Sequence, residues 1–389
     1  MKDAPVRADW LARPETQAIL AALDGAAGRT RAVGGIVRDT LMERAHDGDI
    51  DMATELLPEN VITRARAAGI ACYPTGIAHG TVTLRLNETL AEVTTLRRDV
   101  ETDGRHAVVA FGTDWVEDAR RRDFHLNAIY CAADGTLFDP LGGAEDARNG
   151  KVRFIGDAAT RIVEDGLRVY RFFRLSASHG QQQLDADGLT ACAAAVSALG
   201  HLSRERVGAE MMRMLGLPNV AMTLAVMSEI GLTRLRDATL RALMTYEAIG
   251  GRAAITRLAL IGRDDLDRLQ DAWRLSRETV NAARAITRAA ALLAEDKVAE
   301  AAYRHGEHAV EGLAAAASEG GWGAARLSEV ARALAATIVP PFPVDGRDLA
   351  GLGMTPGPAL GAELARLERA WIDSGFALGR EDLLALAQR

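Results

Sequence analysis

The spacing of hydrophobic and polar positions changes along the chain and separates an early region from a later one. In the early region, residues 81–87 (TVTLRLN) and 90–97 (LAEVTTLR) alternate between apolar and polar positions, a pattern typical of strands. Asn87 and Glu88 are placed to form a hairpin turn between them. The other elements expected there are strands at residues 31–33 and 49–54, a turn and helix at 34–44, and a helix at 58–68.

The strand pattern ends near residue 157, and the rest of the chain is rich in Ala, Leu and Arg at helical spacing. We expect residues 314–325 (AAAASEGGWGAA) to be the loosest connection in this region. The pattern predicts an α+β protein, with a mixed sheet and helices in a head at residues 1–155 and only helices after it. Breaks between helices are expected at Gly216–Pro218, Gly250–Gly251, Gly320–Gly321 and Pro340–Pro341.

The composition is that of an ordinary globular protein, since 48% of the 389 residues are hydrophobic and 25% are charged. No run of about 18 apolar residues is present, so no transmembrane helix is expected. The first residues lack the apolar core of a signal peptide. Cys72, Cys131 and Cys192 lie far apart in apolar surroundings and are expected to be reduced core residues. These features together predict a cytoplasmic protein.

The net charge of −7 argues mildly against a nucleic-acid partner, because such proteins often carry a basic surplus. A local basic stripe is nevertheless sufficient to bind phosphates. The basic residues are almost all Arg, with Lys only at positions 2, 151 and 297. Arg suits bidentate contacts to phosphates and base edges, although a compositional bias of the genome would give the same excess.

The first candidate chemistry is a pair of carboxylates in the segment DGDIDMATE. Asp49 and Asp51 share one face of the expected strand, where like charges repel unless a cation lies between them. Glu92 lies on a later expected strand, and three such carboxylates could hold two Mg²⁺ ions. Gly34 and Gly35 precede a helix whose first N–H groups could bind an anion. Each feature alone is typical of a solvated turn or surface strand, but their combination favours a nucleotide site.

Two later segments carry further candidates. In ARRRDFHLNAIY, Asp123 and Asn127 are four residues apart and would share one face of a helix. That face is either an ordinary charged surface or, together with Arg122, a contact to the triphosphate or sugar of a nucleotide. In EDGLRVYRFFRLSA, Asp165 and Arg168 would lie side by side on a helix, as an ordinary salt bridge or as a base-reading pair. Arg171 and Arg174 extend that face as a possible phosphate track.

The base-reading interpretation has a specific chemical consequence. A carboxylate accepts a hydrogen bond from an exocyclic amine, and a guanidinium donates one to a ring nitrogen. Cytosine and adenine present both groups, whereas uracil and guanine present a carbonyl in place of the amine. Such a pair should therefore accept C and A and reject U and G.

An ordered set of segments resembles a known family, the class II tRNA nucleotidyltransferases and bacterial poly(A) polymerases. The resemblance covers about residues 30–215 and, less specifically, the tail FPVDGRDLAGLGMTPGPALGAELARLERAW. It implies a DNA polymerase β-like nucleotidyltransferase head at 1–155, a helical neck for base recognition at 156–215, and a helical, tRNA-binding body and tail at 216–389. The segments are VGGIVRD, GDIDMAT, AEVTTLR, RRDFHLNAI, DPLGGAEDARNGKVRFIGDA, RIVEDGLRVYRFFR and LSRERVGAEM.

The resemblance assigns a role to each candidate residue. Asp49, Asp51 and Glu92 would be the catalytic, metal-binding carboxylates. Asp165 and Arg168 would be the protein template that selects CTP and ATP, with support from Glu164. The segment 97–112 (RRDVETDGRHAVVAFG) would be the flexible loop needed for the final A. The remaining assignments are Gly34, Gly35 and Arg38 at the triphosphate, Arg122, Asp123 and Asn127 near the sugar, and Arg206 and Glu210 in the neck.

The implied reaction is addition or repair of the 3′-terminal CCA of tRNA from CTP and ATP, assisted by two Mg²⁺ ions and releasing pyrophosphate. Gly166, His125 and Gly48 depart from the usual residues of the family, in place of Pro, Thr and a basic residue. Three alternatives stay open: a poly(A) polymerase, a partial adder of CC or of A only, and a non-catalytic RNA-binding protein. Segment 97–112 lacks the GRRF-type sequence of the poly(A) polymerases.

Overall fold

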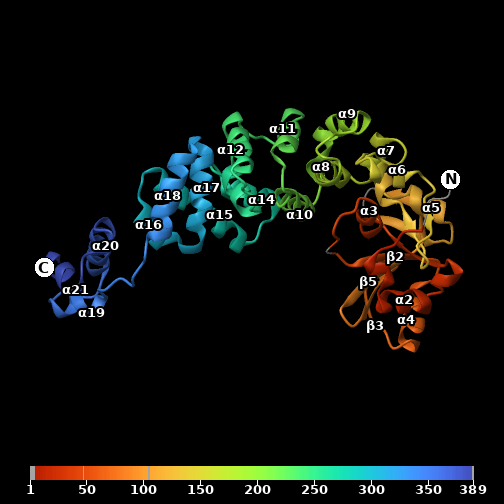
Figure 1. Cartoon of the computed structure of the whole chain (residues 1–389), viewed down its shortest axis with the longest axis horizontal. Helices are drawn as coiled ribbons and strands as arrows, with labels where there is room; N and C mark the ends of the chain where they lie inside the picture. Colours follow the sequence, from red (N-terminus) through yellow and green to blue (C-terminus); the bar gives the residue numbers. More distant parts are fainter. Residues whose placement is uncertain (1–4, 47, 104–105, 388–389) are drawn as a thin grey trace. The chain divides into compact units, whose positions relative to one another are not determined.

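The structure is a computed structural model that describes residues 5–46, 48–103 and 106–387 (Figure 1). The chain forms two compact units. The first contains the residues up to Leu202 together with Ile230–Leu232, and the second contains Ser203–Glu229 and the residues from Thr233 onward.

The first unit is built on one seven-stranded mixed sheet with the order β3-β4-β5-β2-β1-β8-β9. Its only parallel pair is β2 with β5, among the described strands. The four strands predicted from the sequence are all present, and β3, β8 and β9 were not predicted. The strands are β1 Thr30–Val33, β2 Ile50–Thr54, β3 Ala71–Gly76, β4 Thr81–Leu86, β5 Thr89–Thr95, β8 Tyr130–Cys131 and β9 Leu137–Phe138.

The three strands without a prediction have weak sequence signals for physical reasons. Strand β3 contains Pro74, which cannot donate to a sheet, and β8 and β9 are two residues each. The predicted hairpin is confirmed, because Leu86 on β4 pairs with Thr89 on β5. Its turn residue Asn87 has a φ of 51°, a left-handed conformation that Asn tolerates.

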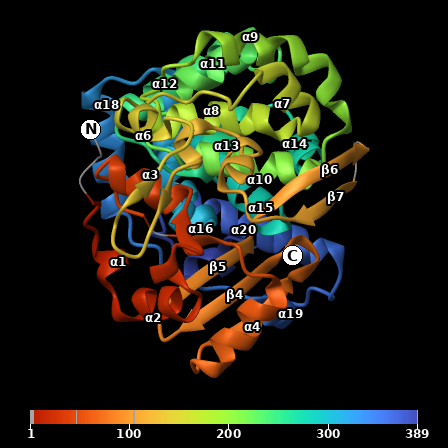
Figure 2. The ribbon, with the colours of Figure 1, turned by 90° about the vertical axis from the view of Figure 1, so that its right-hand side faces the viewer.

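Helices cover the sheet and extend beyond it in the first unit. Helix α4 lies against strands β3–β5, as Figure 2 shows beside β4, α2 packs on α4 and β4, and α3 packs against β1 and β2. The helices are α1 Asp9–Ala12, α2 Pro14–Ala22, α3 Gly35–Leu41, α4 Pro58–Ala67, α5 Trp115–Arg120, α6 Gly143–Arg148, α7 Ala158–Glu164, α8 Leu167–His179 and α9 Ala186–Ala195. The 3-10 turns are η1 Gly25–Ala27, η2 Ile77–His79, η3 His125–Asn127 and η4 Val196–His201.

The segment expected to be a flexible loop, residues 97–112, forms an antiparallel pair of strands. Strand β6 (Arg97–Asp103) pairs with β7 (His106–Phe111), with an irregular register between Asp99 and Glu101. Residues 104–105, in the middle of the predicted loop, lie outside the described residues.

The second unit contains helices and no strand among its described residues, so the predicted α+β class and the helical remainder are confirmed. Three of the four predicted breaks fall between helices, and the fourth, Gly320–Gly321, spans the end of α17. The helices are α10 Arg204–Leu215, α11 Ala221–Glu229, α12 Asp237–Ala248, α13 Ala254–Ile261, α14 Leu266–Trp273, α15 Arg277–Ala294, α16 Val298–His305, α17 Ala309–Gly320, α18 Ala324–Ala336, α19 Gly346–Gly351, α20 Pro358–Asp373 and α21 Arg380–Leu386, with η5 at Gly306–His308.

The prediction of a loose connection at residues 314–325 is wrong. Helix α17 continues through Gly320, and Ala315, Ala316 and Ala317 are buried. The helix packs closely on α15, because small side chains allow two helix backbones to approach each other. Only residues 321–323 connect α17 to α18.

The three cysteines are free in the structure. Cys131 and Cys192 are buried, as predicted, and Cys72 is partly exposed. Burial raises the pKa of Cys131 and Cys192 to about 12, which keeps both thiols protonated. Within the described residues, none of the helices has the length and apolar character needed to cross a membrane.

Candidate functional site

Two of the candidate carboxylates are direct neighbours on the sheet. Asp51 on β2 pairs in register with Glu92 on β5, the parallel neighbour of β2. Both side chains are exposed on strands whose flanking residues are buried. Asp49 is also exposed and precedes β2 by one residue. The fold therefore brings Asp51 and Glu92 together from segments about forty positions apart.

The electrostatics of this group favour a cation. Asp51 keeps solvent-exposed surface, but the protein packed around it removes part of its hydration and raises its pKa above its ordinary value, and the nearby carboxylates of Glu92 and Asp49 raise it further. Arg122 and His46 act in the opposite direction. Among the described residues, no three His, Cys, Asp or Glu side chains already converge as a metal site. The donor chemistry still fits Mg²⁺, which prefers a few carboxylates together with phosphate oxygens.

The glycine pair lies next to these acids. Gly34 precedes α3 with a φ of 78° and a ψ of −132°, a conformation that strongly favours glycine. A Cβ at this position would lie 3.7 Å from Oδ2 of Asp51. The first turn of α3 begins at Gly35, and the first N–H groups of a helix have no partner within it. A phosphate bound to this turn would therefore be close to Asp51.

Arg122 is held in place inside the first unit. Its Nε and Nη2 donate to Oδ2 of Asp118 at 3.2 and 3.1 Å, and its guanidinium lies over the ring of Tyr130. Burial alone would lower the pKa of Arg122, but the charge of Asp118 and the contact with Tyr130 more than offset this and raise it. Arg122 is therefore a permanently charged group whose field reaches Asp51.

Asp123 and Asn127 are in contact, although the helix that the spacing predicted is absent. Nδ2 of Asn127 donates to Oδ1 of Asp123 at 3.1 Å. Helix α5 ends at Arg120, and Asn127 belongs to the short turn η3. Nε of Arg171 donates to Oδ2 of Asp123 at 2.7 Å, so the guanidinium predicted for a phosphate track binds a carboxylate here.

Asp165 and Arg168 do not lie on one helix, which corrects the sequence interpretation. Asp165 is the residue after α7, and Gly166 precedes α8, on which Arg168 is the second residue. The two residues remain close, since the backbone N–H of Arg168 donates to the carbonyl oxygen of Asp165 at 3.0 Å. The residues still meet because the chain turns at Gly166.

The guanidinium of Arg168 is fixed by several neighbours. Its Nη1 donates to Oε2 of Glu164 at 2.6 Å and to the carbonyl oxygen of Arg161 at 2.8 Å. Arg161 also binds Glu164 and donates to the carbonyl oxygens of Arg121 and Arg122. Glu164 thus supports Arg168. Arg161 links Glu164 to the segment that carries Arg122.

The remaining candidates lie on two helices. Arg174 is partly buried on α8, three residues after Arg171 and six after Arg168, so the three share one side of the helix. Arg206 is exposed and Glu210 is buried on α10, where Glu210 accepts a hydrogen bond from Arg213 at 3.1 Å. Helix α10 belongs to the second unit, whereas every other candidate belongs to the first.

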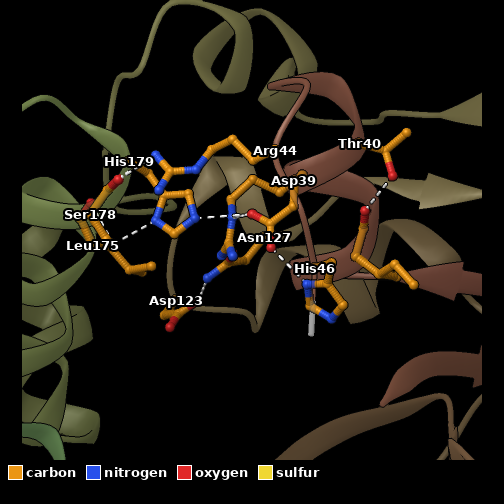
Figure 3. Close-up of polar contacts among 11 residues, drawn as sticks. Asp39, Thr40, Arg44, His46, Asp123, Asn127, Leu175, Ser178 and His179 are labelled. Carbon is orange, nitrogen blue, oxygen red and sulfur yellow. Dashed lines mark hydrogen bonds and ion pairs between the residues drawn. The ribbon is translucent and has the colours of Figure 1, made fainter. Parts of the chain in front are cut away.

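A buried carboxylate near the site escaped the sequence interpretation. Asp39 on α3 accepts a hydrogen bond from Arg38 and faces the rings of His46 and His179, which lie on either side of it in Figure 3. Arg38, expected at the triphosphate, also donates from Nη1 to Oδ1 of Asn127 at 2.8 Å. Burial alone would raise the pKa of Asp39, but the hydrogen bonds and the charge of Arg38 hold it well below its usual range. Asp39 ends the segment VGGIVRD, but nothing in that segment indicated that it would be buried between two histidines.

The structure gives a reason for one departure from the family pattern. The ring of His46 lies over Gly48, where a Cβ would come within 2.9 Å of its Nε2. Any larger residue at position 48 would displace a ring that Asp39 anchors at 2.7 Å. Glycine therefore leaves room for the His46 ring at this point of the loop before Asp49, and a residue with a Cβ would require the ring to shift. Asp47, between them, lies outside the described residues.

Comparisons with known proteins give a consistent result. A family model described as the poly A polymerase head domain matches residues 30–153. A protein named CCA tRNA nucleotidyltransferase 1, mitochondrial, from Danio rerio is 32% identical over 393 residues, covering 91% of this chain and 86% of the relative. The protein of the same name from Homo sapiens is 33% identical, covering 92% and 86%. A crystal structure of Bacillus stearothermophilus CCA-adding enzyme in complex with CTP matches with a TM-score of 0.80 at 29% identity, covering 96% and 97% of the two chains.

Proposed function

The chain belongs to the family of CCA tRNA nucleotidyltransferases, and we propose that it adds or repairs the 3′-terminal CCA of tRNA from CTP and ATP. The observation that carries the proposal is the pair Asp51 and Glu92 beside the Gly34 turn. Similarity to relatives of that name extends over 86% of their length, and a similar solved structure contains CTP.

The reaction joins an RNA end to a nucleotide. The 3′ oxygen of the RNA forms a bond to the α-phosphorus of CTP or ATP, the bond to the β-phosphate oxygen breaks, and pyrophosphate leaves while the hydroxyl proton passes to solvent. Asp49, Asp51 and Glu92 would hold Mg²⁺, which when bound neutralises the triphosphate and makes the attacking hydroxyl more acidic. The Gly34 turn and the fixed charge of Arg122 would orient the triphosphate next to these carboxylates.

Selection of the base is assigned to Asp165 and Arg168. The carboxylate would accept from the exocyclic amine of cytosine or adenine, and the guanidinium would donate to the ring nitrogen. The contacts of Arg168 with Glu164 and with the carbonyl oxygen of Arg161 support this role, because they limit the orientations open to the guanidinium. A guanidinium that cannot turn away discriminates more sharply than a mobile one.

The wider assignments follow the same proposal. Residues 1–155 would form the catalytic head, 156–215 the neck with Arg206 and Glu210, and 216–389 the tRNA-binding body and tail. Arg174 would meet phosphates, as predicted for both arginines, whereas the guanidinium of Arg171 binds Asp123. The cytoplasmic location suggested by the reduced cysteines stays a prediction, since the vertebrate relatives are named as mitochondrial.

The test is an extension assay with purified protein, Mg²⁺ and three tRNAs that end before CCA, after the first C and after CC. Each tRNA receives CTP, ATP or both, and products are sized on a sequencing gel. We expect every end to be completed to CCA and extension to stop there. Asp51→Asn is the matched control, which keeps the side-chain size but removes the charge, and we expect it to extend none of the three.

Each alternative has its own outcome in the same assay. A growing ladder of A residues would identify a poly(A) polymerase, a candidate favoured by the match of residues 30–153 to a model of that name. Addition limited to C, or to the last A, would identify a partial adder. Binding of tRNA without any extension would identify a non-catalytic RNA-binding protein and would overturn the proposal.

A further inference from the structure

Asp39 brings together three side chains from separate segments of the first unit. Its Oδ1 accepts from Nε of Arg38 at 2.8 Å and faces Nε2 of His179 at 3.0 Å, and its Oδ2 faces Nδ1 of His46 at 2.7 Å (Figure 3). Asp39 is only 6% exposed. Because the carboxylate is ionised, each facing imidazole nitrogen is a donor, and both rings are oriented by one group.

His46 connects Asp39 to the loop that carries Asp49. Its ring lies between two glycines, because a Cβ on Gly48 would come within 2.9 Å of its Nε2 and a Cβ on Gly35 within 3.2 Å of its Cε1. Gly48 directly precedes Asp49 in the chain. The His46 ring therefore occupies the space between Gly48, which precedes Asp49, and Gly35 at the start of α3.

His179 connects Asp39 to the helix that carries Arg168. It is the last residue of α8, and next to it the carbonyl oxygen of Ser178 accepts a hydrogen bond from Nη1 of Arg44. The same helix is held near its start, where Arg171 binds Asp123. Two attachments along one helix leave it little freedom to tilt against α3.

The second attachment leads back to the same carboxylate. Asp123 accepts from Nδ2 of Asn127, whose Oδ1 accepts from Arg38, and Arg38 donates to Asp39. A continuous series of hydrogen bonds thus runs from Arg171 to Asp39, and α8 between Arg171 and His179 closes it into a ring. Asp39, Asp123 and Asn127 are buried members of this series, and the cost of leaving a buried polar group unpaired favours one arrangement of it.

We propose that Asp39 is a positioning residue that couples the base-selecting helix α8 to the metal-carrying loop before β2. The inference rests on the proposed function. A nucleotide that fits Asp165 and Arg168 leaves α8 in its position relative to α3. Asp39 then holds His46, and with it the loop that carries Asp49, in place. A base that displaces α8 disturbs the same carboxylate and misplaces Asp49. A wrong base should therefore slow the nucleotidyl transfer step as well as bind more weakly.

The test is a double-mutant cycle on the full-length protein with His46→Ala, His179→Ala and the double variant. For each we would measure kcat/KM for CTP and for UTP on a tRNA ending before CCA. In the contacts above, Asp39 is the partner that the two histidines share. If they act through it, losing either one already breaks the coupling. The double variant should then lose no more CTP-over-UTP selectivity than the single variant with the larger loss. The expected single loss is about 5-fold or more. Losses that multiply, or single variants without a loss, would overturn the inference.

A second readout separates positioning from general destabilisation. His179→Ala is expected to raise the Mg²⁺ concentration needed for half-maximal activity, although His179 lies on α8 and not on the metal-carrying loop. It is also expected to weaken the Ca²⁺-dependent part of CTP binding, measured by calorimetry without turnover. The conservative variants His179→Gln and His46→Asn keep an amide N–H donor in place of Nε2 of His179 and Nδ1 of His46, and both variants should keep the wild-type metal response and CTP binding. A lowered melting temperature with an unchanged metal response would assign His179 a structural role only.

Controls keep the outcomes distinct. His201→Ala removes an exposed histidine of the same unit that contacts only a neighbouring carbonyl oxygen in the described hydrogen bonds, and it should behave as wild type. If an alanine variant does not fold, Asp39→Asn is measured in its place. It must show both a lower CTP-over-UTP selectivity and a higher Mg²⁺ concentration for half-maximal activity. A wild-type protein that extends no tRNA would refute the proposed function. An active wild type with independent histidines would refute this inference alone.

Discussion

At the residue scale, burial and charge oppose each other in the pair of Asp39 and His179. Burial lowers the pKa of His179, and the hydrogen bond to Asp39 only partly reverses this effect. The charges of Arg38 and Arg44 lower it further. The folded protein therefore holds His179 neutral at a pH where an unfolded chain, with a His pKa of about 6.5, has begun to take up a proton.

This difference predicts how stability responds to acid. Below about pH 6.5 the unfolded state binds more protons at this position than the folded state, so the free energy of unfolding falls as the pH falls. The limit for one group is about 1.4 kcal/mol per pH unit. His179→Gln keeps the Nε2 donor without titrating, and its unfolding curves from about pH 7.5 to 5.5 should lose less stability than wild type. Parallel pH profiles for the two proteins would contradict the assignment.

At the element scale, Arg257 on α13 organises the connection between α10 and α11. It is fully buried, and its Nη1 donates to the carbonyl oxygens of Leu215 and Leu217 at 2.6 Å each. Its Nη2 donates to the carbonyl oxygen of Pro218 at 2.8 Å and to Glu247 at 3.1 Å. One guanidinium thus binds three carbonyl oxygens of the turn, of which that of Leu215 belongs to a buried residue.

Replacement of Arg257 should be costly for the second unit. Arg257→Met keeps the length of the side chain but leaves Glu247 and three carbonyl oxygens without this donor, and we expect the free energy of unfolding to fall by about 3 kcal/mol. Arg236→Met is the control, because Arg236 and Asp264 form an exposed pair whose loss should cost less than about 1 kcal/mol. Equal costs, measured by urea denaturation, would show that burial does not matter here.

At the scale of the whole molecule, the residues proposed to bind nucleotide all belong to the first of two compact units. Each unit has its own apolar core, for example around Tyr130 in the first and around Trp371 in the second. Ligand binding stabilises only the part of a protein that loses the site when it unfolds.

Calorimetry of the full chain should therefore show more than one unfolding transition, and CTP with Ca²⁺ should raise the temperature of one of them. At a CTP concentration of about 100 times Kd the expected stabilisation is about 2.7 kcal/mol. The Asp51→Asn variant should show the same transitions without that shift. A uniform shift of the whole profile would mean that the two units unfold as one.

The sequence by itself determined the class of fold and the kinds of chemistry. Period-two alternation predicted β4, β5 and the turn at Asn87, because each depends on neighbours in the chain. The types and order of the residues predicted that the carboxylates, the glycine turn and the arginines belong to the site, since a reaction requires particular chemical groups. The sequence also predicted that Asp123 and Asn127 would meet, although it assigned them to a helix that does not form.

Only the tertiary structure decided which distant groups share a partner. The register of β2 and β5 sets Asp51 beside Glu92, and the fold of the first unit brings His46 and His179 to Asp39. Arg257 has the pattern of an ordinary helical residue, yet it is fully buried. The physical reason is the same in each case. Periodicity reports local geometry, whereas pairing, burial and charge depend on residues far apart in the chain.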